Sequence, residues 1–187
     1  MLIKDAQREM RVVFLGGSIG QAVSGLLWLI SAALGTWVST RSALLALVAG
    51  GMFIFPLTQL ILKLTGHPTS VSKKNALSQL AVQVAFVVPL CLPLIGIIAS
   101  YNVNYFYPSF MIVVGVHYLP FIFLYGNWQF GLLGGLLIGG GIVLMMLRYT
   151  EFFTGGWLTA GILLIFAFIL MQAYLKESGL WQKDKRI

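Results

Sequence analysis

Six long apolar stretches dominate the hydrophobic pattern of the chain, and polar residues gather in the segments between them. No Asp, Glu, Lys or Arg occurs anywhere from Asn75 to Leu147. A helix that spans a bilayer needs about 20 mostly apolar residues. The pattern therefore predicts six transmembrane helices, at residues 12–38, 43–65, 76–101, 106–126, 128–147 and 152–175.

Composition supports this interpretation. Of the 187 residues, 59% are hydrophobic and only 9% are charged, whereas soluble domains carry about 25% charged residues. Short connections make sequential helices antiparallel neighbours. We therefore expect an all-α, polytopic transmembrane bundle in one domain over residues 1–187, built of three antiparallel helical hairpins and surrounded by the lipid bilayer.

Basic residues set the expected orientation of the bundle. Only Arg41 and Arg148, of the 12 lysines and arginines, lie on the side opposite the two chain ends. The others flank the apolar stretches on the first side: Lys4, Arg8, Arg11, Lys63, Lys73, Lys74, Lys176, Lys183, Lys185 and Arg186. The positive-inside rule then predicts that both termini are cytoplasmic. The net charge of +7 reflects this bias, and we expect no nucleic-acid partner.

The N-terminal segment has an amphipathic pattern. Leu2, Ala6, Met10 and Val13 recur at helical spacing among polar residues. This spacing predicts a short helix on the inner leaflet that leads into the first span. A disordered segment is the alternative.

Small residues recur every four positions in two of the expected helices. They are Gly16, Gly20 and Ser24 in the first span, and Gly131, Gly135 and Gly139 in the fifth. Residues at this spacing share one helix face and allow a neighbouring backbone to approach closely. We expect the two faces to pack inside the bundle, with contacts between subunits of a homo-oligomer as the alternative.

Four prolines fall near the middle of their spans and predict helix kinks. They are Pro56, Pro89, Pro93 and Pro120. Each proline lacks an N–H group and frees the carbonyl four residues earlier. In hydrocarbon such a carbonyl needs another partner. The kinks are compatible with ordinary bent helices or with a polar cavity at the midplane.

Four polar side chains are expected within the membrane interior: Gln21, Gln83, His117 and Tyr118. A buried polar group without a partner costs about 1–3 kcal/mol, so these residues should face one another or water. His117 should point inward. Its expected partner is a glutamine, Tyr118 of a neighbouring chain, or the carbonyl freed by Pro56 on the second helix.

The absence of other motifs narrows the function classes. No span contains a carboxylate for an ion-coupled relay. The single cysteine and two histidines suggest no metal site, and we expect no cofactor. The leading hypothesis is a small transporter or channel-like protein for a neutral or weakly basic solute, with Gln21, Gln83, His117 and Tyr118 at its site. A non-catalytic scaffold or accessory subunit is the alternative. An intramembrane enzyme with His117 as general base is a third hypothesis.

The stretch HYLPFIFLYG at residues 117–126, together with six spans and cytoplasmic tails, resembles a small family of uncharacterised bacterial membrane proteins. The resemblance covers most of the chain. It implies a multi-pass protein of the bacterial inner membrane, and it implies no particular activity.

Reporter fusions test the expected orientation. Fusions after Lys74 and after Lys185 should both report a cytoplasmic location, and a fusion near Arg41 should report an external one, because the basic residues favour the cytoplasmic side. An external signal at Lys185 would mean that the number of spans is odd.

Overall fold

The computed structural model describes residues 1–147 and 151–184, with side chains through residue 179, and all regular secondary structure in this part of the chain is helical. The elements are α1 (Ile3–Val13), η1 (Leu15–Gly17), α2 (Ser18–Trp37), α3 (Thr40–Gly51), α4 (Ile54–Leu64), α5 (Leu77–Ala85), α6 (Val87–Tyr101), η2 (Val103–Tyr105), α7 (Phe106–Tyr118), α8 (Phe121–Tyr125), α9 (Gln129–Leu147) and α10 (Thr154–Asp184). Arg148, Lys185 and Arg186, which entered the orientation prediction, lie outside the described residues.

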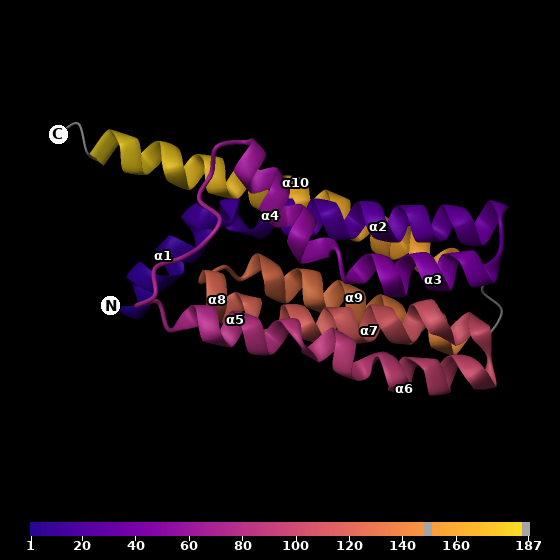
Figure 1. The fold of residues 1–187 in the computed structure, drawn as a ribbon. Coiled ribbons are helices and arrows are strands. Elements are labelled where there is room, and N and C mark those ends of the chain that lie inside the picture. Colours follow the sequence, from indigo (N-terminus) through magenta and orange to yellow (C-terminus); the bar gives the residue numbers. More distant parts are fainter. Residues whose placement is uncertain (148–150, 185–187) are drawn as a thin grey trace.

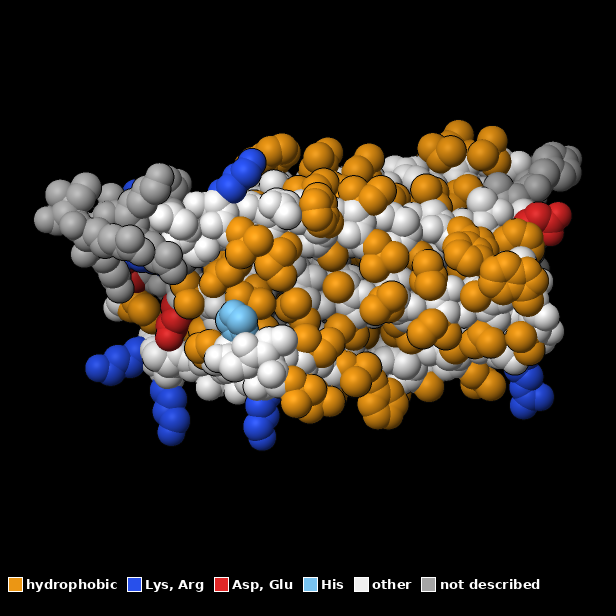
Figure 2. Space-filling view, turned by 90° about the horizontal axis from the view of Figure 1, so that it is seen from above, with side chains coloured by type: hydrophobic (Ala, Val, Ile, Leu, Met, Phe, Trp, Pro, Cys, Tyr) orange, Lys and Arg blue, Asp and Glu red, His pale blue; other side chains and the backbone are white. Residues whose placement is uncertain are grey.

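Long apolar helices make up most of the molecule. Among the described residues, five helical segments are long and apolar enough to cross a membrane, and the bent pair α3–α4 raises the number to six if it counts as one span. Hydrophobic side chains cover the middle of the molecule, and charged side chains lie toward its two ends (Figure 2). The all-α prediction is confirmed for the described residues, and the apolar helices indicate a membrane protein.

The helices form two groups that lie side by side (Figure 1). In one group α2 packs against α3, α4 and α10, and in the other α7 packs against α6 and α9. Helix α1 and the C-terminal part of α10 lie at the same end of the molecule, which we call the terminal end. Helix α10 packs mainly against α2 rather than against its sequence neighbour α9, so the fold is more than a row of sequential hairpins.

The first expected span is interrupted near its start. Leu15, Gly16 and Gly17 all have positive φ angles, of 49°, 66° and 85°. This conformation suits glycine, which has no Cβ atom to clash with the backbone. The chain therefore turns between α1 and α2, and the first apolar span runs from Leu15 to Trp37 rather than from residue 12 to residue 38.

Helix breaks lie close to three of the four prolines. Pro56 is the third residue of α4, Pro89 is the third residue of α6, and Pro120 directly precedes α8. The first helical turn tolerates proline because N–H groups there have no helical partner in any case. By contrast, Pro93 lies inside α6, which continues past it. The chain thus places three of its prolines where a new helix starts.

The largest bend separates α3 from α4. The two helices differ in direction by 58° across the break at Met52 and Phe53.

The α7–α8 break shows how a carbonyl next to a proline is satisfied. The carbonyl of Val116, which Pro120 was expected to free, accepts a hydrogen bond from the Leu119 N–H at 3.1 Å. A tighter local turn therefore satisfies this carbonyl, and no second helix is needed for it.

Helix α1 is docked on the bundle. Ala6, Met10 and Val13 are buried, whereas Leu2 is 76% exposed. Their apolar face contacts α5, α8 and the η1 turn. The predicted helix and most of its apolar face are present, but protein rather than an open lipid surface covers that face.

The first small-residue stripe does not form a common packing face. A Cβ atom at Gly16 would lie 3.3 Å from the Cβ of Tyr174 on α10, and one at Gly20 would lie 3.8 Å from Oγ1 of Thr58 on α4. Ser24 faces Tyr118 of α7. The turn at η1 takes Gly16 off the axis of α2, so the three residues contact three different helices.

The second stripe is also displaced from the position predicted for it. Cβ atoms at Gly135 and Gly139 would meet nothing within 4 Å, and only Gly131 contacts the bundle, at Ile122. The close approach instead involves Gly115 and Gly134, where an added Cβ on either residue would lie 2.8 Å from the carbonyl oxygen of the other. Packing of Gly135 and Gly139 inside the bundle was therefore a wrong prediction, because α7 lies on the adjacent face of α9.

Paired substitutions on α9 test this assignment. Gly134→Ala should destabilise the protein by about 1–3 kcal/mol, because the new methyl group collides with the backbone of α7. Gly135→Ala should be neutral or stabilise by up to about 1 kcal/mol through helix propensity. Thermal unfolding in detergent measures both, and equal losses at the two positions would contradict the packing described here.

Candidate functional site

Polar side chains line the contact between α2 and α7, where the two helix groups meet. We call this set the α2–α7 seam and define it by five residues: Gln21, Ser24, Ser31, Tyr107 and Tyr118. The Ser31 and Tyr107 hydroxyl oxygens lie 2.6 Å apart. Three helical turns further along α7, the Tyr118 hydroxyl faces the side chains of Ser24 and Gln21. The two helices run antiparallel, so each tyrosine meets polar residues of α2.

Aromatic packing closes the seam toward the end opposite the terminal end. The Trp28 ring centroid lies 5.8 Å from that of Tyr107 and 5.3 Å from that of Phe110. Tyr107 also contacts Phe152, at 4.9 Å. Trp28 and Tyr107 are among the largest fully buried side chains. This half of the seam is therefore filled by rings, and the polar groups near Tyr118 lie on its other side.

Gln21 is the least satisfied group in the seam. Its side chain is 3% exposed. Within the part of the chain that the structure describes, its Oε1 atom accepts no hydrogen bond. Leaving a buried acceptor unpaired costs about 1–3 kcal/mol. The seam therefore holds an amide oxygen with an open position for a donor, next to the hydroxyl groups of Ser24 and Tyr118.

His117 bonds to a partner that differs from the ones predicted for it. Its Nδ1 atom lies 2.9 Å from the carbonyl oxygen of Val84, near the end of α5. Since a carbonyl only accepts, the ring nitrogen donates in this bond. The expected partner on the second helix, the carbonyl freed by Pro56, is therefore wrong. The histidine instead joins the α7–α8 break to the α5–α6 break.

Gln83 lies outside the seam. Its side chain is exposed on α5, whereas Val84 beside it is buried. Consecutive helical residues point in different directions, and in this part of α5 it is Val84 that faces the bundle. Of the four polar residues expected to face one another, the structure brings together Gln21 and Tyr118. It leaves His117 at their edge, with its ring centroid 5.3 Å from that of Tyr118.

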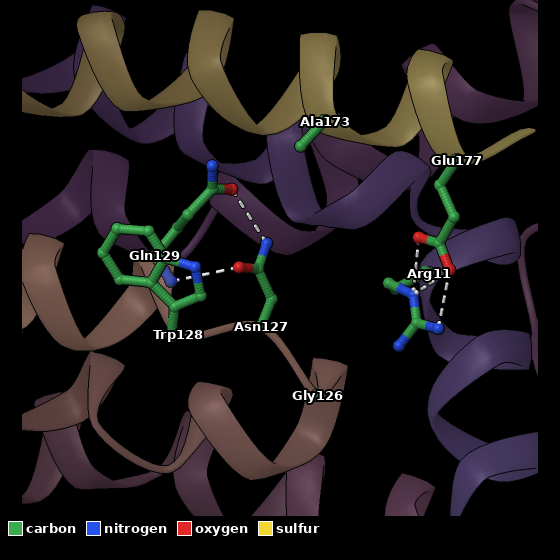
Figure 3. A pocket seen from close by; sticks show the side chains of 7 residues that line it. All are labelled: Arg11, Gly126, Asn127, Trp128, Gln129, Ala173 and Glu177. Atoms are coloured by element: carbon green, nitrogen blue, oxygen red, sulfur yellow. Dashed lines mark hydrogen bonds and ion pairs between the residues drawn. The ribbon is translucent and has the colours of Figure 1, made fainter.

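A pocket of about 360 Å³ opens at the terminal end (Figure 3). It is lined by Arg11, Gly126, Asn127, Trp128, Gln129, Ala173 and Glu177. Arg11 donates to Glu177 through Nε and Nη2, with the shortest contact at 2.8 Å. Asn127 caps the start of α9, where its Oδ1 accepts from the Gln129 N–H at 3.0 Å. The charges of the pocket therefore neutralise each other, and most of its hydrogen-bonding groups are already paired.

Further polar contacts hold α1 over the same end. Gln7 donates to the carbonyl of Phe123 at 2.7 Å. Glu9 accepts from the Ser72 N–H at 2.7 Å and from the Asn75 amide at 2.8 Å. Asn75 is 1% exposed. Helix α1 is thus tied to α8, to α10 and to the segment between α4 and α5.

The sequence analysis did not identify these α1 contacts. Glu9 and Glu177 are two of only five acidic residues in the chain, and that rarity is a usable signal. The sequence could not identify the partners of these glutamates, because the packing of α10 against the η1 turn is what brings Arg11 and Glu177 together.

The long apolar helices on either side of this polar seam indicate an all-α, multi-helix membrane protein. A model of a family of unknown function, DUF7010, matches residues 3–173, and the chain belongs to that family. No curated protein and no solved structure matches the chain.

Substitution of His117 tests its structural bond. His117→Phe should destabilise the protein by about 1–3 kcal/mol, because it keeps an aromatic ring but removes the N–H group that the Val84 carbonyl accepts from α7. His117→Asn keeps a donor near the position of Nδ1 and should recover part of the loss. Thermal unfolding in detergent measures both variants, and an unchanged His117→Phe protein would mean that the bond contributes nothing.

Proposed function

We propose that this protein is a small transporter of the bacterial inner membrane that binds a neutral or weakly basic solute in the α2–α7 seam. The terminal end faces the cytoplasm in this proposal. The site consists of Gln21, Ser24 and Tyr118. His117 supports it from the side by fixing α7 to α5.

The unpaired amide oxygen of Gln21 is the observation that carries the proposal. It is buried beside two hydroxyl groups, and few, well-placed polar groups in an apolar surround are typical of small-molecule sites. An acceptor with an open position favours a solute that donates an N–H or O–H group. The seam contains no charged residue, which favours a solute without a full charge.

The helix breaks supply the flexibility that transport needs. Transporter sites often lie where spanning helices are discontinuous. Here α3–α4, α5–α6 and α7–α8 are all interrupted, and the last break begins directly after Tyr118. Movement of α8 relative to α7 would open the seam toward the terminal end without disturbing the contact between α7 and α9.

The described conformation is closed on both sides. Trp28, Tyr107 and Phe110 fill the seam on one side. On the other side, Tyr125 and Phe130 pack near Gly17, with the Phe130 ring 3.0 Å from the position of an added Cβ, and α1 lies over this end. Access to Gln21 from the cytoplasm therefore requires displacement of α1.

A scaffold or accessory subunit is the second candidate. The open glycines Gly135 and Gly139 on α9 favour it, because small residues on an exposed face allow another transmembrane helix to approach closely. In that case the seam would be a packed core, and its polar groups would serve only to join the helix groups.

Cysteine accessibility distinguishes the two candidates. In a Cys91→Ser background, Ser24→Cys should react with a small water-soluble thiol reagent at least about tenfold faster than Ser109→Cys. Both serines are buried, at 5% and 4% exposure, but Ser109 is outside the seam and bonds to its own helix at the Phe106 carbonyl. Glu177→Gln should raise the rate at position 24, because it loosens α1, and should leave position 109 unchanged. Equal rates at the two positions would contradict the transporter proposal.

A stability measurement complements the labelling. Gln21→Leu removes the amide with its unpaired oxygen together with the contact to Tyr118, and should leave thermal stability nearly unchanged, as expected for a residue retained for binding at the expense of packing. A loss above about 2 kcal/mol would instead indicate a structural amide and would favour the scaffold.

A further inference from the structure

The α5–α6 span is the least covered of the long helical segments. In its most apolar stretch 11% of the residues are buried inside the molecule, compared with at least 33% in each of the other four spans. Leu90 is 76% exposed and Ile97 is 58% exposed. Lipid can cover such apolar side chains, so their exposure alone identifies no partner.

Two glutamines lie on this exposed surface. Gln79 and Gln83 are both exposed, and residues four apart share a helix face. Within the described residues, neither side chain takes part in a hydrogen bond, whereas the buried Asn75 close by has several partners. Gln83 lies about 9 Å along the helix axis from the first residue of α5. Where such a side chain faces hydrocarbon, lipid offers no hydrogen-bond partner to its primary amide.

The same span contains two prolines that alter its backbone hydrogen bonding. Pro89 and Pro93 remove the N–H groups that the carbonyls of Ala85 and Pro89 would normally bond. All three residues are exposed. Further along α6, a Cβ atom at Gly96 would meet nothing within 4 Å. A neighbouring helix could therefore approach α6 closely and donate hydrogen bonds to the α5–α6 break.

We propose that the exposed face of α5–α6 is the contact surface for a second copy of this chain, related by a two-fold axis along the membrane normal. A primary amide both donates and accepts, so it complements an identical group. A two-fold axis of this direction brings each residue to the depth of its own copy. Gln83 then pairs with Gln83 of the second chain, and Gln79 with its own counterpart. Hydrogen bonds between amides join transmembrane helices in this way.

The open glycine face of α9 is a weaker choice for the dimer. The exposed side chains around Gly135 and Gly139 include Leu132, Leu136 and Val143. All three are apolar, so lipid satisfies them fully. Unlike this α9 face, the α5–α6 face presents polar side chains for which the described residues provide no partner, and this gives a second protein chain an advantage over lipid.

Oxidative cross-linking in native membranes tests the surface. In a Cys91→Ser background, Leu90→Cys should form a disulfide-linked dimer with copper phenanthroline at least about tenfold faster than Val143→Cys. Val143 is a matched control because it is 53% exposed on α9. Along the helix axis, Val143 lies about 20 Å from the first residue of its span, and Leu90 lies about the same distance from the first residue of its own span. Equal rates, or faster linkage at Val143, would overturn the proposal.

Subunit counting of the otherwise unmodified chain in bilayers gives an independent readout. Gln83→Leu should raise the dimer dissociation constant roughly fivefold to thirtyfold, as expected for the loss of one or two interhelical hydrogen bonds. Gly135→Leu, which adds the same side chain on α9, should leave it unchanged. If the face contacts only lipid, Gln83→Leu will instead stabilise a protein that counts as a monomer, and that result would also overturn the proposal.

Discussion

Backbone hydrogen bonding in an apolar medium is the constraint on which the rest of this structure depends. A helix satisfies its own carbonyls, and proline prevents that for the residue four positions earlier. The chain meets this constraint in different ways at different breaks. The Val116 carbonyl, four residues before Pro120, accepts from Leu119 nearby in the chain. The Val84 carbonyl lies where α5 ends, and it accepts from the imidazole of His117 on another helix. That second bond fixes the relative position of α5 and α7, which in turn places Tyr118 against α2.

The polar residues of the bundle serve two different purposes. At one level of the seam, Ser31 bonds both to the Ala43 carbonyl and to Tyr107, and these groups are fully paired and surrounded by rings. At the other level, Gln21 keeps an unpaired acceptor beside Ser24 and Tyr118. The first arrangement joins helices, whereas the second is what a site for a small donor molecule requires. In the proposed transporter, helix α1, which is tied through Arg11 to Glu177, would lie on the route from the terminal end to this second level.

The proposed dimer and the proposed transport site make separate demands on the fold. The dimer uses the outer face of α5–α6, and the site uses the inner face of α7 and α2. His117 lies between them, because it bonds to α5 and contacts the Tyr118 ring. A dimer would therefore hold α5, α6 and α7 near its centre, leaving α2, α3, α4 and α10 on the outside. Relative movement of the two helix groups would then occur at the seam without disturbing the contact between subunits.

The sequence by itself determined the helical class, the approximate spans, the amphipathic α1 and the approximate positions of three helix breaks, because hydrophobic period and proline chemistry act locally. It also singled out Gln21, His117 and Tyr118 as unusual residues. Only the tertiary structure decided which direction each residue faces. Gly135 is exposed because α7 packs against a different face of α9. Gln83 is exposed because Val84, its neighbour in α5, faces the bundle. The pairing of Arg11 with Glu177 and of His117 with Val84 joins segments far apart in the chain. Such pairings depend on helix rotation and on the bends at the breaks, which no local pattern in the sequence specifies.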